Sequence, residues 1–144
     1  DLWNAANFRL ALIQALEAHG HEVSIAGPPD QELEARLRMP HRKILPLPMR
    51  KDGISPWEEG RLLARFVRLV SREQPDVLLS FTPKPNIYGA LAASVLGVPA
   101  IPNVSGLGTA FIRRGPLQHL LTVLYRAALR RAPVVFFQNE EDLQ

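Results

Sequence analysis

The chain has 144 residues, of which 47% are hydrophobic and 22% charged, and its formal net charge is +3. This length suits one globular domain, and the composition excludes a disordered tract or a fibrous repeat. The absence of cysteine excludes disulfides, thiol catalysis and zinc ribbons, and it fits a cytoplasmic protein. No apolar run approaches the ~18 to 20 residues that a membrane-spanning helix needs.

The first third of the chain predicts two helices and two short strands. Apolar residues recur at spacings of three and four over residues 4–18, and Gly20 follows where a C-terminal cap belongs. Residues 22–27 are typical of a short strand, and a proline turn then leads into a polar helix over residues 31–38. Residues 43–48 predict a second short strand, which its prolines limit.

The rest of the chain alternates regularly between helices and strands. Residues 56–73 give the clearest helix, and residues 76–81 form an apolar run typical of a parallel strand buried on both faces. The pattern then repeats as helix 86–96, strand 99–104, helix 116–131 and strand 133–138. The predicted fold class is therefore α/β, an open Rossmann-like parallel sheet with helices on both faces, formed by residues 1–144 as a single domain.

Both ends of the sequence interrupt this alternation. The chain opens on a helix pattern with no strand before it, and it stops as an acidic helical turn begins after Gln138. We expect a first strand before Asp1, so the chain is predicted to be a fragment of a longer protein.

Ligands of open α/β sheets collect at the carboxyl ends of the strands. One such segment is FTPKPNIYG, residues 81–89. Pro83 and Pro85 end the strand, and Asn86 is suited to cap the next helix, whose free N–H groups favour an anion. Thr82 and Lys84 add a hydroxyl and an ammonium, so the loop could hold a phosphate or sugar hydroxyls. The alternative is a simple strand end with a solvated lysine.

A second such segment covers residues 103–109, NVSGLGT, where two glycines permit close approach of a ligand to the backbone. The spacing is not a dinucleotide-binding fingerprint, and an ordinary turn explains it equally well. Asp30 stands where a ribose-binding acid could follow a strand, but capping of the helix at 31–38 is the better interpretation.

Arginines line two predicted helices. Arg61, Arg65, Arg68 and Arg72 align on one face of helix 56–73, and a second cluster comprises Arg113, Arg114, Arg126, Arg130 and Arg131. Solvated edges of core helices are one interpretation, and adsorption to anionic lipid headgroups is the sharper alternative. Nucleic acid is disfavoured, because aromatic residues do not interleave with these arginines.

Neither the histidines nor the hydroxyl residues predict a catalytic centre. His19, His21, His41 and His119 lack the spacing of a metal site, and no nucleophile elbow is present. We therefore expect no metal and no self-contained catalytic apparatus within these residues.

Four segments taken together resemble a known family. They are Asn7-Phe8-Arg9, residues 84–89 (KPNIYG), residues 106–108 (GLG) and residues 136–142 (FFQNEED). In this order, on alternating α/β elements, they are similar to the N-terminal lobe of bacterial retaining glycosyltransferases of family four, in the branch that builds surface polysaccharide or glycan precursors on a lipid carrier.

The resemblance implies an enzyme of two Rossmann-like lobes, in which this lobe receives the acceptor. The donor lobe, with the family's paired glutamates, is then expected after Gln144, and this chain alone should be inactive. Acceptor contacts are implied for Asn7, Phe8, Arg9, Thr82, Lys84, Asn86 and Tyr88, contacts to the sugar or diphosphate for Ser105, Gly106 and Gly108, and a place facing the interlobe cleft for Gln138 and Asn139. The histidine that many members carry in the loop at residues 103–109 is absent here.

The implied reaction transfers a sugar, a hexosyl or N-acetylhexosaminyl group, from a UDP-type donor to a lipid-diphosphate-linked saccharide. It retains the anomeric configuration and uses no cofactor or metal. An acceptor of this kind places the enzyme in the cytoplasm, peripheral on the inner face of the cell membrane, where the arginine faces contact anionic lipid. Two alternatives remain open: a non-catalytic α/β ligand-binding domain, and a sugar-nucleotide epimerase of similar two-lobe architecture.

Overall fold

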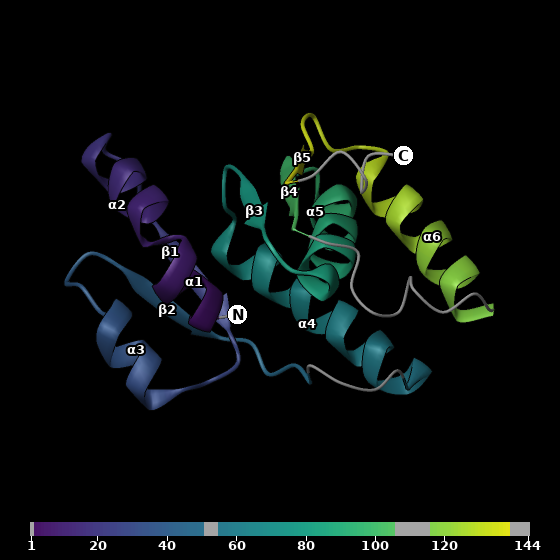
Figure 1. Cartoon of the computed structure of the whole chain (residues 1–144), viewed down its shortest axis with the longest axis horizontal. Coiled ribbons are helices and arrows are strands. Elements are labelled where there is room, and N and C mark those ends of the chain that lie inside the picture. Colours follow the sequence, from purple (N-terminus) through teal and green to yellow (C-terminus); the bar gives the residue numbers. More distant parts are fainter. Residues whose placement is uncertain (1, 51–54, 106–115, 139–144) are drawn as a thin grey trace. The chain divides into compact units, whose positions relative to one another are not determined.

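The computed structural model describes residues 2–50, 55–105 and 116–138 (Figure 1). The chain divides into two compact units, Asp1–Gly53 and Ile54–Gln144. We call them the N-terminal unit and the C-terminal unit, and each is described by itself.

The N-terminal unit packs three helices and a two-stranded parallel sheet. Its elements are α1 (Leu2–Phe8), α2 (Leu10–Ala18), β1 (Ser24–Gly27), α3 (Gln31–Leu37) and β2 (Lys43–Pro46). Strands β1 and β2 pair in register from Ser24 opposite Lys43 to Gly27 opposite Pro46. The core of this unit consists of Leu2, Ala5, Ala6, Ile13, Ile25 and Leu37.

The expected single helix over residues 4–18 is wrong, because the structure has two helices that meet at Arg9. The backbone of Arg9 departs from helical geometry, with φ −120° and ψ 2°. Asn7 donates its side-chain Nδ2 to the Trp3 carbonyl oxygen at 2.8 Å, a local contact of the kind that bends helices. Phe8 packs edge-on against Trp3, with ring centroids 5.3 Å apart. Apolar spacing alone does not reveal such local contacts.

Two predicted caps in this unit are confirmed. Gly20 ends α2 with φ +84°, a conformation that only glycine adopts without strain. Asp30 caps α3, since its Oδ1 accepts a hydrogen bond from the Leu33 N–H at 3.0 Å. The Asp30 side chain is therefore occupied by the helix end, as the sequence indicated.

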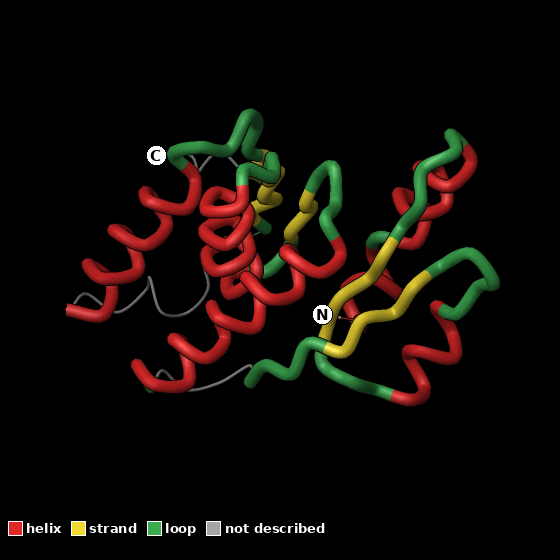
Figure 2. Tube along the Cα trace, turned by 180° about the vertical axis from the view of Figure 1, so that it is seen from behind, coloured by secondary structure: helices red, strands yellow, loops and turns green. Residues whose placement is uncertain are grey.

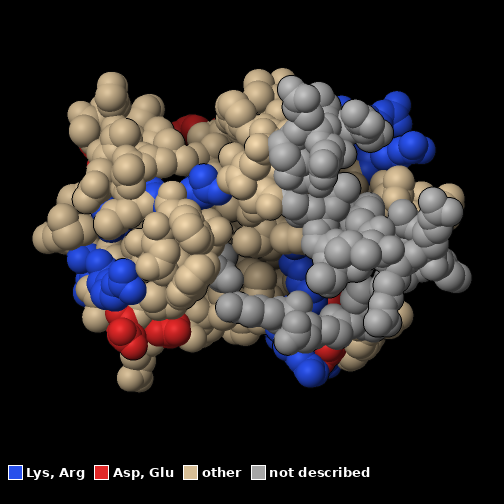
Figure 3. Space-filling view, viewed as in Figure 1, with Lys and Arg blue, Asp and Glu red and all other residues tan. Residues whose placement is uncertain are grey.

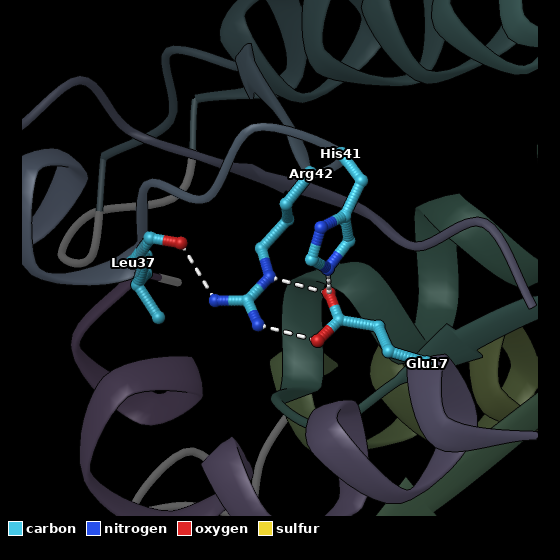
Figure 4. A network of polar contacts seen from close by, with 4 residues as sticks. All are labelled: Glu17, Leu37, His41 and Arg42. Carbon is cyan, nitrogen blue, oxygen red and sulfur yellow. Dashed lines mark hydrogen bonds and ion pairs between the residues drawn. The ribbon is translucent and has the colours of Figure 1, made fainter.

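A buried arginine joins α2 to the segment that enters β2 (Figure 4). Arg42 donates Nε and Nη2 to the two carboxylate oxygens of Glu17, at 2.7 and 2.6 Å, and Nη1 to the Leu37 carbonyl at 2.6 Å. His41 lies 3.5 Å from the same carboxylate. The hydrogen bond from Arg42 holds the pKa of Glu17 below its ordinary value. This bidentate pair locks the packing of the N-terminal unit.

The C-terminal unit is a three-stranded parallel sheet with its helices. Its elements are α4 (Pro56–Glu73), β3 (Leu78–Ser80), the π-helical turn η1 (Pro85–Gly89), α5 (Ala90–Leu96), β4 (Ala100–Val104), α6 (Pro116–Leu129) and β5 (Phe136–Phe137). The strand order is β3-β4-β5, and both pairings are parallel. The predicted α/β class with parallel strands is confirmed.

Helix α5 packs between α4 and α6 and covers β3 and β4 (Figure 2). Small side chains, Ala90, Ala93, Ala100 and Ala128, form the core that these elements share. Gly89 permits this approach, because an added Cβ would lie 3.2 Å from Leu78 Cδ2 and 3.4 Å from Phe66 Cε1. Among the described residues, none of the helices has the length and hydropathy needed to cross a membrane.

Candidate functional site

The carboxyl ends of β3, β4 and β5 meet at one edge of the C-terminal unit. Hydrogen bonds link the three loops that leave this edge. Ser105 donates its Oγ–H to the Phe81 carbonyl at 3.1 Å, and the Gln138 N–H donates to the Val104 carbonyl at 3.1 Å. Fixed loops at the carboxyl edge of a parallel sheet are the usual place of a ligand site in this fold class.

Lys84 is the charged group of the loop after β3. Its Nζ lies 2.7 Å from Glu59 Oε1 in a partly buried ion pair, and 21% of its side chain is exposed. Sequence reasoning missed Glu59, which lies in the first turn of α4 and is buried. Acidic residues in a first helical turn are common, so only the tertiary fold shows that this one reaches the loop.

Tyr88 lies one helical turn after Lys84 and is buried. Burial raises the pKa of its phenol, and the Glu59 carboxylate, as hydrogen-bond partner and as negative charge, raises that pKa further. The phenol therefore stays neutral and keeps its proton at physiological pH. Glu59 thus lies beside both Lys84 and Tyr88.

Asn86 does not cap a helix, and that prediction is wrong. It lies inside η1, after Pro83 and Lys84, which are already helical. Its backbone N–H donates to the Thr82 carbonyl at 2.8 Å, and its side-chain Nδ2 donates to the Asn103 carbonyl at 3.0 Å. Asn86 fixes the loop to β4, and only 1% of its surface is accessible to a ligand.

Four buried oxygen atoms around this edge have no hydrogen-bond partner among the described residues. They are Glu59 Oε2, Ser80 Oγ, Asn86 Oδ1 and Asn103 Oδ1. Buried polar atoms are nearly always paired, with protein, water or a ligand. Of these four, Ser80 Oγ and Asn103 Oδ1 leave unmet acceptor capacity at the edge, which suits a ligand that carries hydroxyl or amide groups.

Other predicted site residues lie elsewhere or outside the description. Gly106, Gly108 and Asn139 lie outside the described residues. Asn7, Phe8 and Arg9 belong to the N-terminal unit, where Phe8 is 62% exposed and the Asn7 side chain is bonded to its own helix. Thr82 and Lys84 are half-buried in the loop after β3.

The arginine face of α4 is the outer surface of an amphipathic helix. Arg61, Arg65, Arg68 and Arg72 are exposed, while Leu62, Phe66 and Val70 are buried. Trp57 precedes the arginines and is 69% exposed, and the Arg61 guanidinium lies 4.9 Å from its ring centroid.

A hollow of about 260 Å³ lies on this face, lined by Arg61, Ala64, Arg65 and Arg68. Figure 3 shows basic side chains over α4, with acidic side chains near them. The second predicted cluster is less defined. Arg113 and Arg114 lie outside the described residues, and Arg131 bonds Ser94. Within the described part of the chain, no group of histidine and acidic residues is arranged to hold a metal ion.

Comparison with known proteins decides the family. Residues 5–143 match the family described as "Glycosyl transferase 4-like domain". The chain belongs to this family. The resemblance of the four segments is thereby confirmed, over nearly the whole chain.

Two relatives illustrate the relationship. The chain is 24% identical over 143 residues to N,N'-diacetylbacillosaminyl-diphospho-undecaprenol alpha-1,3-N-acetylgalactosaminyltransferase of Campylobacter jejuni, covering 96% of this chain and 38% of that protein. The crystal structure of Acinetobacter baumannii MurG superposes with a TM-score of 0.61 and 19% identity, covering 92% of this chain and 36% of that one. The chain thus spans under two fifths of either relative, and the second comparison shows the shared fold.

Proposed function

We propose that this chain is the acceptor-side lobe of a glycosyltransferase that transfers a sugar from a nucleotide-sugar, UDP-linked, to a lipid-diphosphate-linked saccharide. Membership of the glycosyl transferase 4-like family carries this proposal. The name of the Campylobacter jejuni relative supports it further, because that protein acts on a diphospho-undecaprenol saccharide. The complete enzyme then also has a donor lobe, and this chain alone is inactive.

The loop after β3 is the part of this lobe that we assign to the acceptor. Lys84 supplies an ammonium that attracts a diphosphate, and Thr82 supplies a hydroxyl. The unpartnered oxygens Ser80 Oγ and Asn103 Oδ1 lie near the same edge and accept hydrogen bonds from sugar hydroxyls. Ser105, through its hydroxyl, and Gln138, through its backbone N–H, fix the neighbouring loops.

Chemistry in such a transfer depends on stabilising the diphosphate that leaves the donor sugar. We propose that fixed dipoles and cations, most of them in the donor lobe, supply this stabilisation without a metal or cofactor. The transferred group is hexosyl or N-acetylhexosaminyl, and its anomeric configuration is retained. The non-catalytic binding domain and the epimerase now have less support than the transferase.

The proposal is tested with the complete enzyme, a panel of UDP-sugars and polyprenyl-diphosphate-linked saccharides. Nuclear magnetic resonance of the product then gives its anomeric configuration. Lys84→Ala is expected to raise the KM for the acceptor about tenfold or more while the KM for the donor changes little, because a charge-assisted contact to one substrate is lost. An effect confined to the donor would contradict the assignment of this loop, and absence of transfer with every pair would contradict the function.

The arginine face of α4 is proposed to dock the enzyme on the anionic inner leaflet, in keeping with a lipid-linked acceptor. Four exposed arginines beside an exposed tryptophan are the composition of an interfacial helix. Each basic residue near such a surface contributes about 1 kcal/mol. Charge reversal of Arg61, Arg65, Arg68 and Arg72 is therefore expected to abolish sedimentation of the complete enzyme with phosphatidylglycerol vesicles at low salt. Unchanged sedimentation would refute the docking surface.

A further inference from the structure

Glu59 is a buried carboxylate that family resemblance does not single out. Only 8% of its surface is exposed, although it belongs to the otherwise exposed first turn of α4. Burial of a carboxylate is unfavourable unless its oxygens are paired, and the helix N-terminus offsets a part of that cost. A buried glutamate in this position therefore needs a group that pairs with its carboxylate.

The partner is the loop of the proposed acceptor site. Oε1 lies 2.7 Å from Lys84 Nζ, and Oε2 is buried without a hydrogen-bond partner among the described residues. Lysine has a flexible four-carbon stem that samples many rotamers when unrestrained. The contact with Glu59 selects among them and so directs the ammonium.

The same carboxylate acts on a second residue of the loop. Lys84 and Tyr88 are four positions apart on a helical segment, so their side chains lie on one face. The Tyr88 phenol is buried beside Glu59, and this burial, together with its hydrogen bond to the Glu59 carboxylate, raises its pKa. One carboxylate of α4 thus orients both polar side chains that face it from η1 and its preceding turn.

We propose that Glu59 is a positioning residue for the acceptor, which holds the Lys84 ammonium in the orientation that receives the acceptor diphosphate. This inference rests on the proposed function. Glu59 itself does not touch substrate, since both its oxygens are buried. A purely structural ion pair would stabilise the unit in the same way but would leave substrate binding alone, so kinetics separate the two roles.

The experiment is a double-mutant cycle in the complete enzyme, with Glu59→Gln, Lys84→Met and the double variant. Glu58→Gln serves as the matched control, because it makes the same chemical change at the preceding, exposed residue of α4. The measured quantities are the KM for the acceptor, the KM for the donor and kcat, with titration of inorganic diphosphate by calorimetry as a readout independent of turnover.

Glu59→Gln is expected to raise the acceptor KM about tenfold, which corresponds to about 1.4 kcal/mol, and to leave the donor KM unchanged. Diphosphate binding should weaken by a similar factor. In the Lys84→Met background the same substitution should add little, because Glu59 acts through Lys84. Glu58→Gln should behave as wild type.

Additive effects of the two substitutions, or equal increases in both KM values, would refute the positioning role. If Lys84→Met itself leaves the acceptor KM unchanged, the proposed function of the loop fails instead, so the two failures are distinguishable. Glu59→Asp covers the case in which Glu59→Gln does not fold. It keeps the charge but withdraws the carboxylate by one methylene, so an intermediate acceptor KM is expected and a wild-type value contradicts the proposal.

Discussion

Among the described residues, each unit contains a partly buried ion pair between residues 25 positions apart, and the two pairs differ in how completely their oxygens are hydrogen-bonded. In the N-terminal unit, Arg42 meets both oxygens of Glu17 and also the Leu37 carbonyl. In the C-terminal unit, Lys84 meets one oxygen of Glu59, and the other oxygen is buried without a hydrogen-bond partner among the described residues.

From this difference we infer that the first pair is structural and that the second serves the proposed acceptor site. A bidentate guanidinium whose third nitrogen donates to a backbone carbonyl fixes the geometry of its own unit, so its contribution is to folding. The Lys84 ammonium contacts one oxygen of Glu59, and its side chain, 21% exposed in the loop after β3, is the cation that we propose for the acceptor. The comparison therefore predicts that breaking the first pair affects stability and that breaking the second affects substrate binding.

The largest effect is expected from Glu17→Gln, which leaves a buried guanidinium without its counter-charge. The free energy of unfolding should fall by about 3 kcal/mol. Denaturant unfolding at neutral pH measures it. The acceptor KM of the complete enzyme, measured at a temperature where the variant is folded, should not change. A rise in acceptor KM would mean that this pair also serves the site, and the comparison would fail.

Low pH should lower the free energy of unfolding of the wild type in part, as the Glu17→Gln substitution does. The pKa of Glu17 is lowered in the folded protein, so the stability it contributes is present above the ordinary value of 4.5 and is lost as pH falls from there through the folded pKa. Unfolding curves from pH 7 to pH 3 should show this decline in the wild type and less of it in Glu17→Gln. Equal declines in both proteins would assign the acid sensitivity to other carboxylates.

Alkaline pH should lower the stability of the C-terminal unit. The pKa of Tyr88 is raised by burial and by Glu59, so its phenol stays protonated after the unfolded chain has ionised. Stability should therefore fall as pH rises above about 10, the ordinary tyrosine value. Tyr88→Phe should weaken this dependence. Stability curves that are identical for the two proteins would contradict the assignment.

A smaller pair of effects is expected from two glycines. A Cβ at Gly27 would lie 3.0 Å from the Leu2 backbone nitrogen, so Gly27→Ala should destabilise the N-terminal unit by about 1.5 kcal/mol through overpacking. Gly60 lies in α4 with nothing within 4 Å of an added Cβ, so Gly60→Ala should stabilise by about 0.8 kcal/mol. Thermal unfolding of both variants shows whether each substitution raises or lowers stability. A loss of stability in Gly60→Ala would contradict the exposed, uncrowded position of Gly60 in α4.

Local chemistry in the sequence was enough for most elements. Pro56 begins α4 and Pro75 follows its end, so the helix was predicted at its observed bounds, Pro56–Glu73. The break at Arg9 and the π-helical turn at residues 85–89 were not predicted, because each depends on contacts of single side chains rather than on periodicity.

The candidate site divides in the same way. The rule that ligands bind at the carboxyl ends of parallel strands selected the loop with Thr82 and Lys84 before any contact was known. Asn86 was predicted to cap a helix and to contact the acceptor, and it lies 1% exposed against Asn103, while Glu59 was not considered. Residues 25 positions apart come together only by tertiary packing, which no local pattern encodes.

By itself, the sequence determined the α/β class, the parallel strands, the helix caps at Gly20 and Asp30 and the family, because these follow from periodicity, backbone preferences and short motifs. The tertiary structure alone decided which charges are paired and which buried polar atoms lack a hydrogen-bond partner among the described residues. The physical reason is that the pairing of a buried charge depends on distance and desolvation, and both are fixed only when elements distant in the chain pack together.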